Sequence, residues 1–265
     1  MSKKRHSESE SEDPIEIRTF SVNHFRAYTI DKHSHDWHQL AYASRGVLTV
    51  NTPTGSWVVP PRRAVFIPAG IEHEIRMTGP VSVRTLYLNS SISDFLPTDC
   101  CVVNVSPLLR ELILHAVDIG MLDRTNAKQA RLTRVIVDQL QAVPTMPLKL
   151  PMPNDSRAVQ NTEILRASPA DHRSIEELSK EVGAGKRTIE RLFATETDMT
   201  FGKWRQQLRL LHALKLLAAG EPVTSVALEV GYDSTSAFIA AFKSVLGTTP
   251  KKYYAEIRLA RVTET

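Results

Sequence analysis

Cysteine is almost absent from this chain of 265 residues: there are two, Cys100 and Cys101, and they are adjacent. Adjacent cysteines make neither a CxxC metal pair nor a disulfide framework. No apolar run approaches the ~20 residues that a membrane-spanning helix needs. The first residues, MSKKRHSESESEDP, lack the apolar core of a secretory signal. We therefore expect a cytoplasmic protein whose residues 1–14 form a disordered tail.

Four patterns follow this tail, and the length favours two domains. Residues 15–104 hold short alternating segments such as GVLTVNT and RAVFIPAG between Gly and Pro, which is typical of a β-sandwich or small barrel. Residues 105–143 contain two helical segments. Residues 144–157 are rich in proline and cannot hold a helix, so we expect a semi-rigid linker there. Residues 158–258 are helical throughout.

The second segment of residues 105–143 has an apolar stripe at helical spacing. Its members are Leu132, Val135, Ile136, Leu140 and Val143. Such a stripe suits a dimer interface, and it equally suits a helix that covers the barrel. We predict a homodimer formed by residues 105–143 and keep the covering role as the alternative.

The helical region contains two helix-turn-helix patterns. They are SIEELSKEVGAGKRTIERLF (174–193) and PVTSVALEVGYDSTSAFIAAFK (222–243). In each, a short amphipathic helix ends at a glycine turn, Gly183 or Gly231, and a second helix begins within a few residues. A supporting helix is followed in this way by a recognition helix that lies in the DNA major groove. One such unit often has only a packing role, whereas two joined by a basic helix indicate a DNA-binding domain.

The first unit starts with a capping box formed by Ser174 and Glu177. Its recognition helix begins near Gly185, a weaker N-cap. Burial of one apolar face leaves four long polar side chains exposed, and Arg and Lys both read bases and hold phosphates. We predict these four as DNA contacts: Lys186, Arg187, Glu190 and Arg191.

A helix over 201–219 joins the two units and carries basic side chains without an acidic one: Lys203, Arg205, Arg209 and Lys215. We predict the first three as phosphate contacts. Its length of about 27 Å, at ~1.5 Å per residue, suits two recognition helices in successive major grooves. The second recognition helix opens at Asp233 or Ser234 and has few long polar side chains. Its predicted contacts, mainly to phosphates and thymine methyl groups, are Ser234, Thr235, Ser236, Ala240 and Lys243.

These motifs carry a family resemblance over residues 159–254. The matching residues are Arg187–Phe193, Trp204, Arg209, Ala213, the run from Val226 to Ser234 with Gly231 and Tyr232, Phe238, Phe242, Lys243, Gly247, Thr249, Pro250 and Tyr253. The region resembles the DNA-binding domain of the AraC/XylS family of bacterial transcription regulators. The resemblance implies a monomeric seven-helix domain that binds double-stranded promoter DNA. Gly185 and Ala240 depart from the pattern, since a Ser-like cap and a larger polar residue are common there.

The β-rich half carries a second resemblance. His33, His35, Gln39 and Gly46 are followed by the run from Pro68 to His73, and together these are similar to the two cupin motifs. That resemblance implies histidines that converge on a metal such as Fe, Mn, Ni or Zn. Gln39 stands where a glutamate is usual, which removes the anionic ligand. The usual glycines are replaced by Ala27 and Arg62, and the usual asparagine by Met77.

Two hypotheses follow for this half. In the first, His33, His35 and His73 bind a divalent metal, the only cofactor that the sequence suggests, with Gln39 or His38 assisting. In the second, these side chains line a small-molecule site in the barrel, with aromatic neighbours. The predicted ligand-binding residues are His33, His35, Trp37, Gln39, Tyr42 and His73, and Trp57, Phe66 and Tyr87 are further candidates.

The sequence thus predicts a multidomain α+β protein: a cupin-like barrel over 15–104, flanking helices over 105–143, and an all-α domain over 158–258 with two helix-turn-helix units. We predict a transcription regulator without catalytic residues, controlled by a small-molecule effector. Its partners would be promoter DNA, a second copy of the chain and, for an activator, RNA polymerase. A metal-dependent cupin enzyme with a helical appendage is the alternative. A methyl-transfer repair sensor would need further cysteines.

Overall fold

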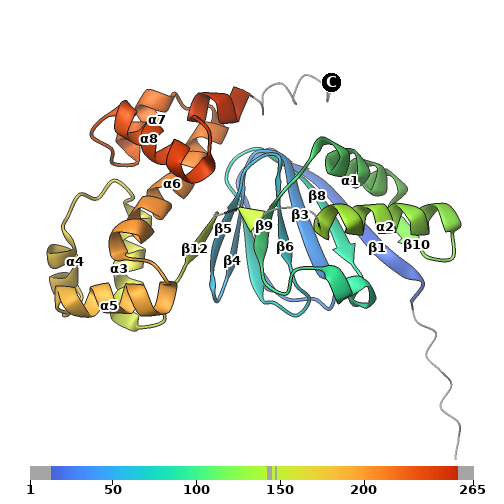
Figure 1. Ribbon diagram of the computed structural model, residues 1–265, viewed down its shortest axis with the longest axis horizontal. Helices are drawn as coiled ribbons and strands as arrows, with labels where there is room; N and C mark the ends of the chain where they lie inside the picture. Colours follow the sequence, from blue (N-terminus) through green and yellow to red (C-terminus); the bar gives the residue numbers. More distant parts are fainter. Residues whose placement is uncertain (1–12, 142–144, 147, 256–265) are drawn as a thin grey trace, which may run out of the picture.

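The computed structural model describes residues 13–141, 145–146 and 148–255. It has a β-rich half followed by a helical half (Figure 1). The predicted tail lies outside the described residues except for Asp13 and Pro14, as do Val143, Pro144 and Pro147. Within the described residues, no helix combines the length and the apolar character that a membrane crossing requires.

Two antiparallel sheets face each other in the β-rich half. The seven-stranded sheet has the order β10-β1-β8-β3-β6-β9-β11, and the five-stranded sheet has the order β12-β5-β4-β7-β2. The strands are β1 (Ile15–His24), β2 (Tyr28–His33), β3 (His38–Arg45), β4 (Leu48–Thr52), β5 (Gly55–Val59), β6 (Arg63–Ile67), β7 (His73–Met77), β8 (Val81–Leu88), β9 (Cys101–Asn104), β10 (Met121–Asp123), β11 (Thr145–Met146) and β12 (Lys149–Pro151). This arrangement confirms the predicted β-rich, cupin-like half.

Strand β3 shows how the alternation of side chains builds two cores. Ala41 belongs to the apolar cluster between the sheets, together with Trp57. Leu40 and Tyr42 belong to a second cluster on the outer face of the seven-stranded sheet. Successive side chains of a strand point to opposite faces, so one strand supplies both clusters.

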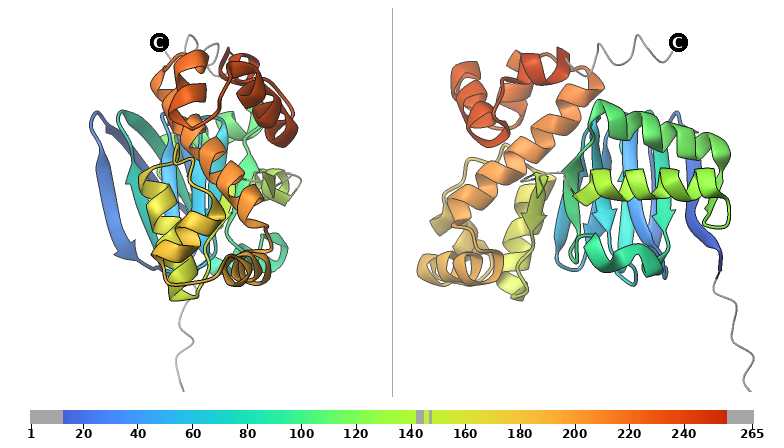
Figure 2. Two further views of the ribbon diagram at one scale, coloured as in Figure 1. Left: turned by 90° about the vertical axis from the view of Figure 1, so that its left-hand side faces the viewer. Right: turned by 45° about the vertical axis from the view of Figure 1, so that its right-hand side comes forward.

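Helices α1 (Pro107–Ile119) and α2 (Ala127–Gln141) cover this outer face (Figure 2). The helix α1 begins with Ser106, whose side chain accepts a hydrogen bond from the Leu109 amide. In the predicted stripe of α2, Ile136 and Leu140 are buried against the sheet, whereas Val135 is 41% exposed. The stripe therefore serves mainly to cover the barrel, which was the alternative to a dimer interface.

Part of the proline-rich segment predicted as a linker joins the barrel. Strand β12 pairs with β5 and forms the edge of the five-stranded sheet. An edge strand tolerates proline, because its outer side needs no main-chain donor. The segment 149–151 is therefore fixed to the sheet instead of forming a free spacer.

The helical half contains α3 (Ser156–Ala167), α4 (Ile175–Glu181), α5 (Lys186–Thr197), α6 (Phe201–Ala219), α7 (Val223–Glu229) and α8 (Thr235–Leu246), and residues 250–255 are also helical. The long helix α6 runs between the pairs α4–α5 and α7–α8 (Figure 1). Its Trp204 is fully buried and contacts Phe193 of α5 edge-on, with ring centroids 5.4 Å apart. The all-α architecture with two helix-turn-helix units is confirmed.

Candidate functional site

The first helix-turn-helix unit is fixed by local contacts at its start and at its turn. The Ser174 hydroxyl accepts a hydrogen bond from the Glu177 amide at 3.2 Å, and Glu177 Oε2 accepts one from the Ser174 amide at 2.7 Å. Gly183 has φ +65°, which lets the chain turn from α4 into α5. The N-cap Gly185 provides no side-chain hydrogen bond, so the first turn of α5 keeps free amide donors.

The exposed face of α5 carries all four residues predicted there as DNA contacts: Lys186, Arg187, Glu190 and Arg191. Lys186 forms an ion pair with Glu176 of the supporting helix α4. Among the described residues, the guanidinium groups of Arg187 and Arg191 have no hydrogen-bond or ion-pair partner. These two arginines, with Glu190 and Arg205, line an open hollow between α5 and the start of α6. Unpaired cations beside an open hollow suit a phosphate backbone or a guanine edge.

Helix α6 presents its basic residues in three different ways. Lys203 is exposed. Arg205 is partly engaged, because one guanidinium nitrogen donates to the Arg173 carbonyl at 2.8 Å and the group lies over the Phe201 ring. Lys215 faces the barrel. It lines a pocket of about 200 Å³ together with residues of the turn between β3 and β4 and of the turn between β7 and β8. Burial, and then the charges of Arg166 and Arg76, lower the pKa of Lys215 to about 8.

The prediction of Arg209 as a phosphate contact is wrong. Its Nε donates to the Pro169 carbonyl at 3.0 Å, Nη1 to Gly231 at 2.8 Å and Nη2 to Asp171 at 2.9 Å. These bonds join the segment before α4 to the turn of the second unit. The guanidinium thus holds the two units together, which the basic character of the helix alone does not reveal.

The second unit follows the same plan with a smaller polar surface. Ser234 is the N-cap of α8, and its hydroxyl accepts a hydrogen bond from the Ala237 amide at 3.2 Å. Ser236, Ala240 and Lys243 are exposed, and Thr235 is half-buried. Lys243 is the one long cationic side chain on this helix, so α8 offers fewer groups for reading bases than α5.

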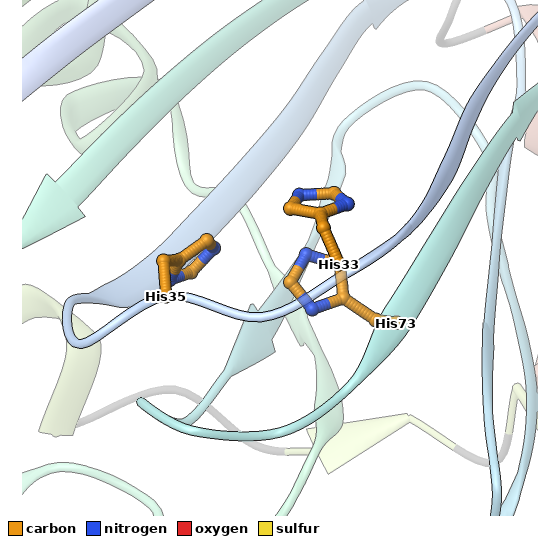
Figure 3. A group of neighbouring side chains, drawn as sticks. All are labelled: His33, His35 and His73. Atoms are coloured by element: carbon orange, nitrogen blue, oxygen red, sulfur yellow. The ribbon is translucent and has the colours of Figure 1, made fainter.

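In the barrel, the structure brings three histidines together (Figure 3). His33 ends β2, His73 begins β7 in register with it, and His35 lies in the connection from β2 to β3. One nitrogen of each ring lies within 4.8 Å of a nitrogen of the other two. His73 is 1% exposed, and His33 and His35 are half-buried.

Main-chain carbonyls orient all three rings. The Nδ1 atoms of His33, His35 and His73 lie 2.8, 2.6 and 2.8 Å from the carbonyl oxygens of Asp31, Trp37 and Ile71. Burial lowers the pKa of His73 to about 4. The Ile71 carbonyl opposes that shift, and His33 and His35 add to it. His73 is therefore a neutral imidazole near pH 7, which is the form that binds metal ions.

The other predicted ligand residues divide between the two faces of the seven-stranded sheet. Gln39 is 2% exposed and its Oε1 lies 3.1 Å from His35 Nε2. Tyr87 also reaches the cluster, with its ring centroid 5.3 Å from that of His35. Trp37 is half-buried, and the Arg18 guanidinium lies 4.5 Å from its ring centroid.

Tyr42, Phe66 and His38 point the other way. Tyr42 and Phe66 belong to the apolar cluster under α1 and α2. His38 stacks near Phe66, and its Nδ1 accepts a hydrogen bond from the Ala69 amide at 3.1 Å. The predictions that Tyr42 lines the barrel interior and that His38 assists the cluster are wrong. Strand β3 starts at His38, so the two-residue period that places Gln39 inside places His38 and Tyr42 outside.

Comparison with known proteins agrees with this division of the chain. The model of the AraC-like ligand binding domain matches residues 18–117, and that of a helix-turn-helix domain matches residues 178–256. The HTH-type transcriptional regulator NimR of Escherichia coli K12 is 36% identical over 225 residues, which cover 85% of this chain and 82% of NimR. The regulator SoxS of the same organism is 32% identical over 81 residues, which cover 30% of this chain and 76% of SoxS.

Among solved structures, that of ToxT from Vibrio cholerae with a bound unsaturated fatty acid covers 94% of this chain and 96% of its own, at 14% identity. The TM-score of this comparison is 0.38. The fold and the two family models define a transcriptional regulator with an N-terminal ligand-binding domain and a C-terminal helix-turn-helix DNA-binding domain. The chain belongs to the AraC family.

Proposed function

We propose that this regulator reads promoter DNA mainly through α5, and that α8 anchors it to the adjacent turn of the duplex. The observation that carries the proposal is the pair of exposed arginines on α5, Arg187 and Arg191, which have no partner among the described residues. Lys203 and Lys243 add exposed cations on α6 and α8. Arg205 borders the same hollow as the two arginines and contributes charge.

A small molecule in the barrel would control this DNA binding through the five-stranded sheet. His33 and His73 lie on β2 and β7 at one side of that sheet, and β12 forms its opposite edge. The Pro151 and Lys149 carbonyls of β12 accept hydrogen bonds from Trp204 and Gln207 of α6. A ligand that favours one arrangement of the sheet therefore shifts α6, provided that it binds the two arrangements with different affinity.

The test measures binding of the full-length protein to DNA from upstream of its own gene. Fluorescence anisotropy reports the binding at a series of salt concentrations. We expect tight, sequence-dependent binding with a steep salt slope. Arg187→Ala and Arg191→Ala should each weaken specific binding by about 1–3 kcal/mol. Arg26→Ala removes an exposed arginine in the connection between β1 and β2 and serves as the control of equal charge. Unchanged binding in both α5 variants would refute the assignment of α5.

We further propose that the barrel half forms a homodimer, so that two DNA-binding halves occupy paired half-sites. Apolar side chains remain exposed around its helical layer: Leu108 is 53%, Met121 57% and Val135 41% exposed. Sedimentation velocity should show a dimer that Val135→Glu or Leu108→Glu weakens. A monomer at all concentrations would overturn this part.

Regulation in the cytoplasm, and not catalysis, is the activity that we propose for the barrel. The histidine cluster contains no carboxylate among the described residues, and Gln39 cannot serve as a general base. RNA polymerase is the additional partner if the regulator activates transcription. A metal-dependent turnover of small molecules by the purified protein would favour the cupin-enzyme alternative.

A further inference from the structure

We propose that His33, His35 and His73 bind one divalent metal ion of the Zn²⁺ class through their Nε2 atoms. The fourth position would stay open to water or to an anionic oxygen of the effector. This inference deepens the proposed ligand-binding function and rests on it only for the role of the effector. The metal site itself stands on the geometry of the three rings (Figure 3).

The hydrogen bonds of the rings fix which nitrogen is free. A main-chain carbonyl oxygen only accepts hydrogen bonds, so each Nδ1 that lies 2.6–2.8 Å from one must carry the proton. In a neutral imidazole the other nitrogen, Nε2, then holds the lone pair. All three rings have the same arrangement with a carbonyl two residues away. A hydrogen bond of this kind on the second nitrogen is how proteins orient histidines that bind metals.

One buried ring nitrogen of the cluster is unsatisfied without a cation. The Nε2 of His73 is buried and has no hydrogen-bond partner among the described residues. A buried polar group without a partner destabilises the site, because it has lost water and gained no hydrogen bond in return. The Nε2 of His35 lies 3.1 Å from Gln39 Oε1, and because this Nε2 carries no proton, a hydrogen bond between them needs the Gln39 amide turned so that its NH2 group donates. A metal ion bound to both Nε2 atoms satisfies the imidazole lone pairs, and the Gln39 oxygen then faces a cation.

The positions of the rings suit a single ion after a modest adjustment. One ring nitrogen of each histidine lies within 4.8 Å of a ring nitrogen of each of the other two. A tetrahedral site with Zn–N distances of about 2.0–2.1 Å needs nitrogens about 3.4 Å apart. Small rotations of His33 and His35, which are only half-buried, close that difference. His73 is held by the barrel core and provides the fixed ligand.

The chemistry of the donors selects the class of metal and of effector. Three imidazole nitrogens suit Zn²⁺ and its neighbours Cu²⁺ and Ni²⁺, whereas Mg²⁺ and Ca²⁺ prefer oxygen. No carboxylate belongs to the cluster in the described part of the chain, so the ion keeps its full charge of two. Three protein ligands leave one position open, as in sites where an exogenous ligand binds the metal. The expected effector is therefore a small organic anion with a metal-coordinating oxygen, such as a carboxylate.

The experiment is a competition titration of metal-free, untagged full-length protein with Zn²⁺ against a chromogenic chelator. We expect one equivalent to bind with high affinity. His33→Ala and His73→Ala should each weaken the binding by roughly tenfold or more. His115→Ala removes an exposed histidine of α1 and should leave the stoichiometry and affinity unchanged. Circular dichroism of each variant verifies that the fold is kept.

Substitution with Co²⁺ provides a second readout that does not depend on affinity. The bound ion should show the visible absorption of four-coordinate Co²⁺, and acetate should shift that absorption by entering the open position. Absence of stoichiometric Zn²⁺ binding, or equal affinity in His73→Ala and wild type, would overturn the site. Normal DNA binding by such a metal-free protein would leave the proposed regulator function intact, so the two proposals fail separately.

Discussion

The indole Nε1 of Trp204 donates a hydrogen bond to the carbonyl oxygen of Pro151, at a distance of 2.7 Å. Trp204 lies in the first turn of α6, the helix that joins the two helix-turn-helix units, and Pro151 ends β12, the edge strand of the five-stranded sheet. The bond therefore joins the DNA-binding half directly to the ligand-binding half.

Trp204→Phe removes the donor and keeps an aromatic ring in the core. The free energy of unfolding should fall by about 1–3 kcal/mol, because a partly buried carbonyl loses its partner. Urea denaturation measures the change. Trp57→Phe is the matched control, since Trp57 is also buried and its indole has no hydrogen bond among the described residues. An equal loss in both variants would show that ring size, and not the hydrogen bond, matters.

Arg209→Lys should destabilise the protein by about 2–4 kcal/mol, because a single ammonium group cannot serve three carbonyls in different directions. The salt slope of DNA binding should stay unchanged, as Arg209 makes no phosphate contact in our assignment. Lys203→Ala should behave in the opposite way: it reduces the salt slope by about 1 and leaves stability within about 0.5 kcal/mol. Thermal denaturation and salt-dependent anisotropy distinguish the two cases.

The two turn glycines should respond differently to alanine. Gly183 has φ +65° and no atom within 4 Å of an added Cβ, so Gly183→Ala carries only the strain of the left-handed backbone, about 1–2 kcal/mol. Gly231 has φ +83°, and an added Cβ would lie 2.9 Å from the Ala170 Cα and 2.9 Å from Arg209 Nη2. Gly231→Ala should therefore lose clearly more stability than Gly183→Ala in the same urea experiment. Equal losses of stability would mean that Arg209 and its hydrogen-bond partners shift to accommodate the added methyl group without a change in the free energy of unfolding.

Lys215 should make the stability of the protein depend on pH under alkaline conditions. Its pKa is lowered to about 8 by burial and by Arg166 and Arg76, from an ordinary value of 10.5. Between these values the unfolded chain binds more protons than the folded one, so the free energy of unfolding rises with pH. Below pH 8 Lys215 is protonated in both the folded and the unfolded chain, so the free-energy cost of burying its charge does not change with pH.

Comparison with Lys215→Met isolates this effect. The wild type should gain about 1–3 kcal/mol relative to the variant as the pH rises from 7.5 to 10. Both proteins share the cysteines and tyrosines that also titrate there, so their contributions cancel in the difference. A difference that does not change with pH would show that Lys215 keeps an ordinary pKa.

Local signals in the sequence predict much of the DNA-binding half. The capping box at Ser174, the glycine at each turn and the cap at Ser234 act within a few residues, so their geometry does not depend on distant contacts. Arg209 was misjudged because its partners, the carbonyl groups of Pro169, Asp171 and Gly231, are distant from it in sequence. The sequence of a helix that carries several basic residues and no acidic one does not show which of the basic side chains turn inward.

In the barrel, the resemblance to the two cupin motifs implied that His33, His35 and His73 lie together, and the structure brings them together. The sequence was not sufficient to assign Tyr42, because that assignment depends on which residue begins β3. The pairing of β12 with β5 was also missed. Proline counts against a strand when the sequence is read locally, and only the tertiary fold shows that Pro151 lies at an edge.

The position of β12 also determines how the chain can be divided. Strand β5 (Gly55–Val59) is fully buried, and β12 covers its outer side. A barrel fragment that stops before Lys149 would expose the main-chain donors and acceptors of this apolar strand, which is a template for pairing with another copy. Such a fragment should self-associate into insoluble material. A fragment that extends through Pro151 keeps the edge protected and should remain dispersed.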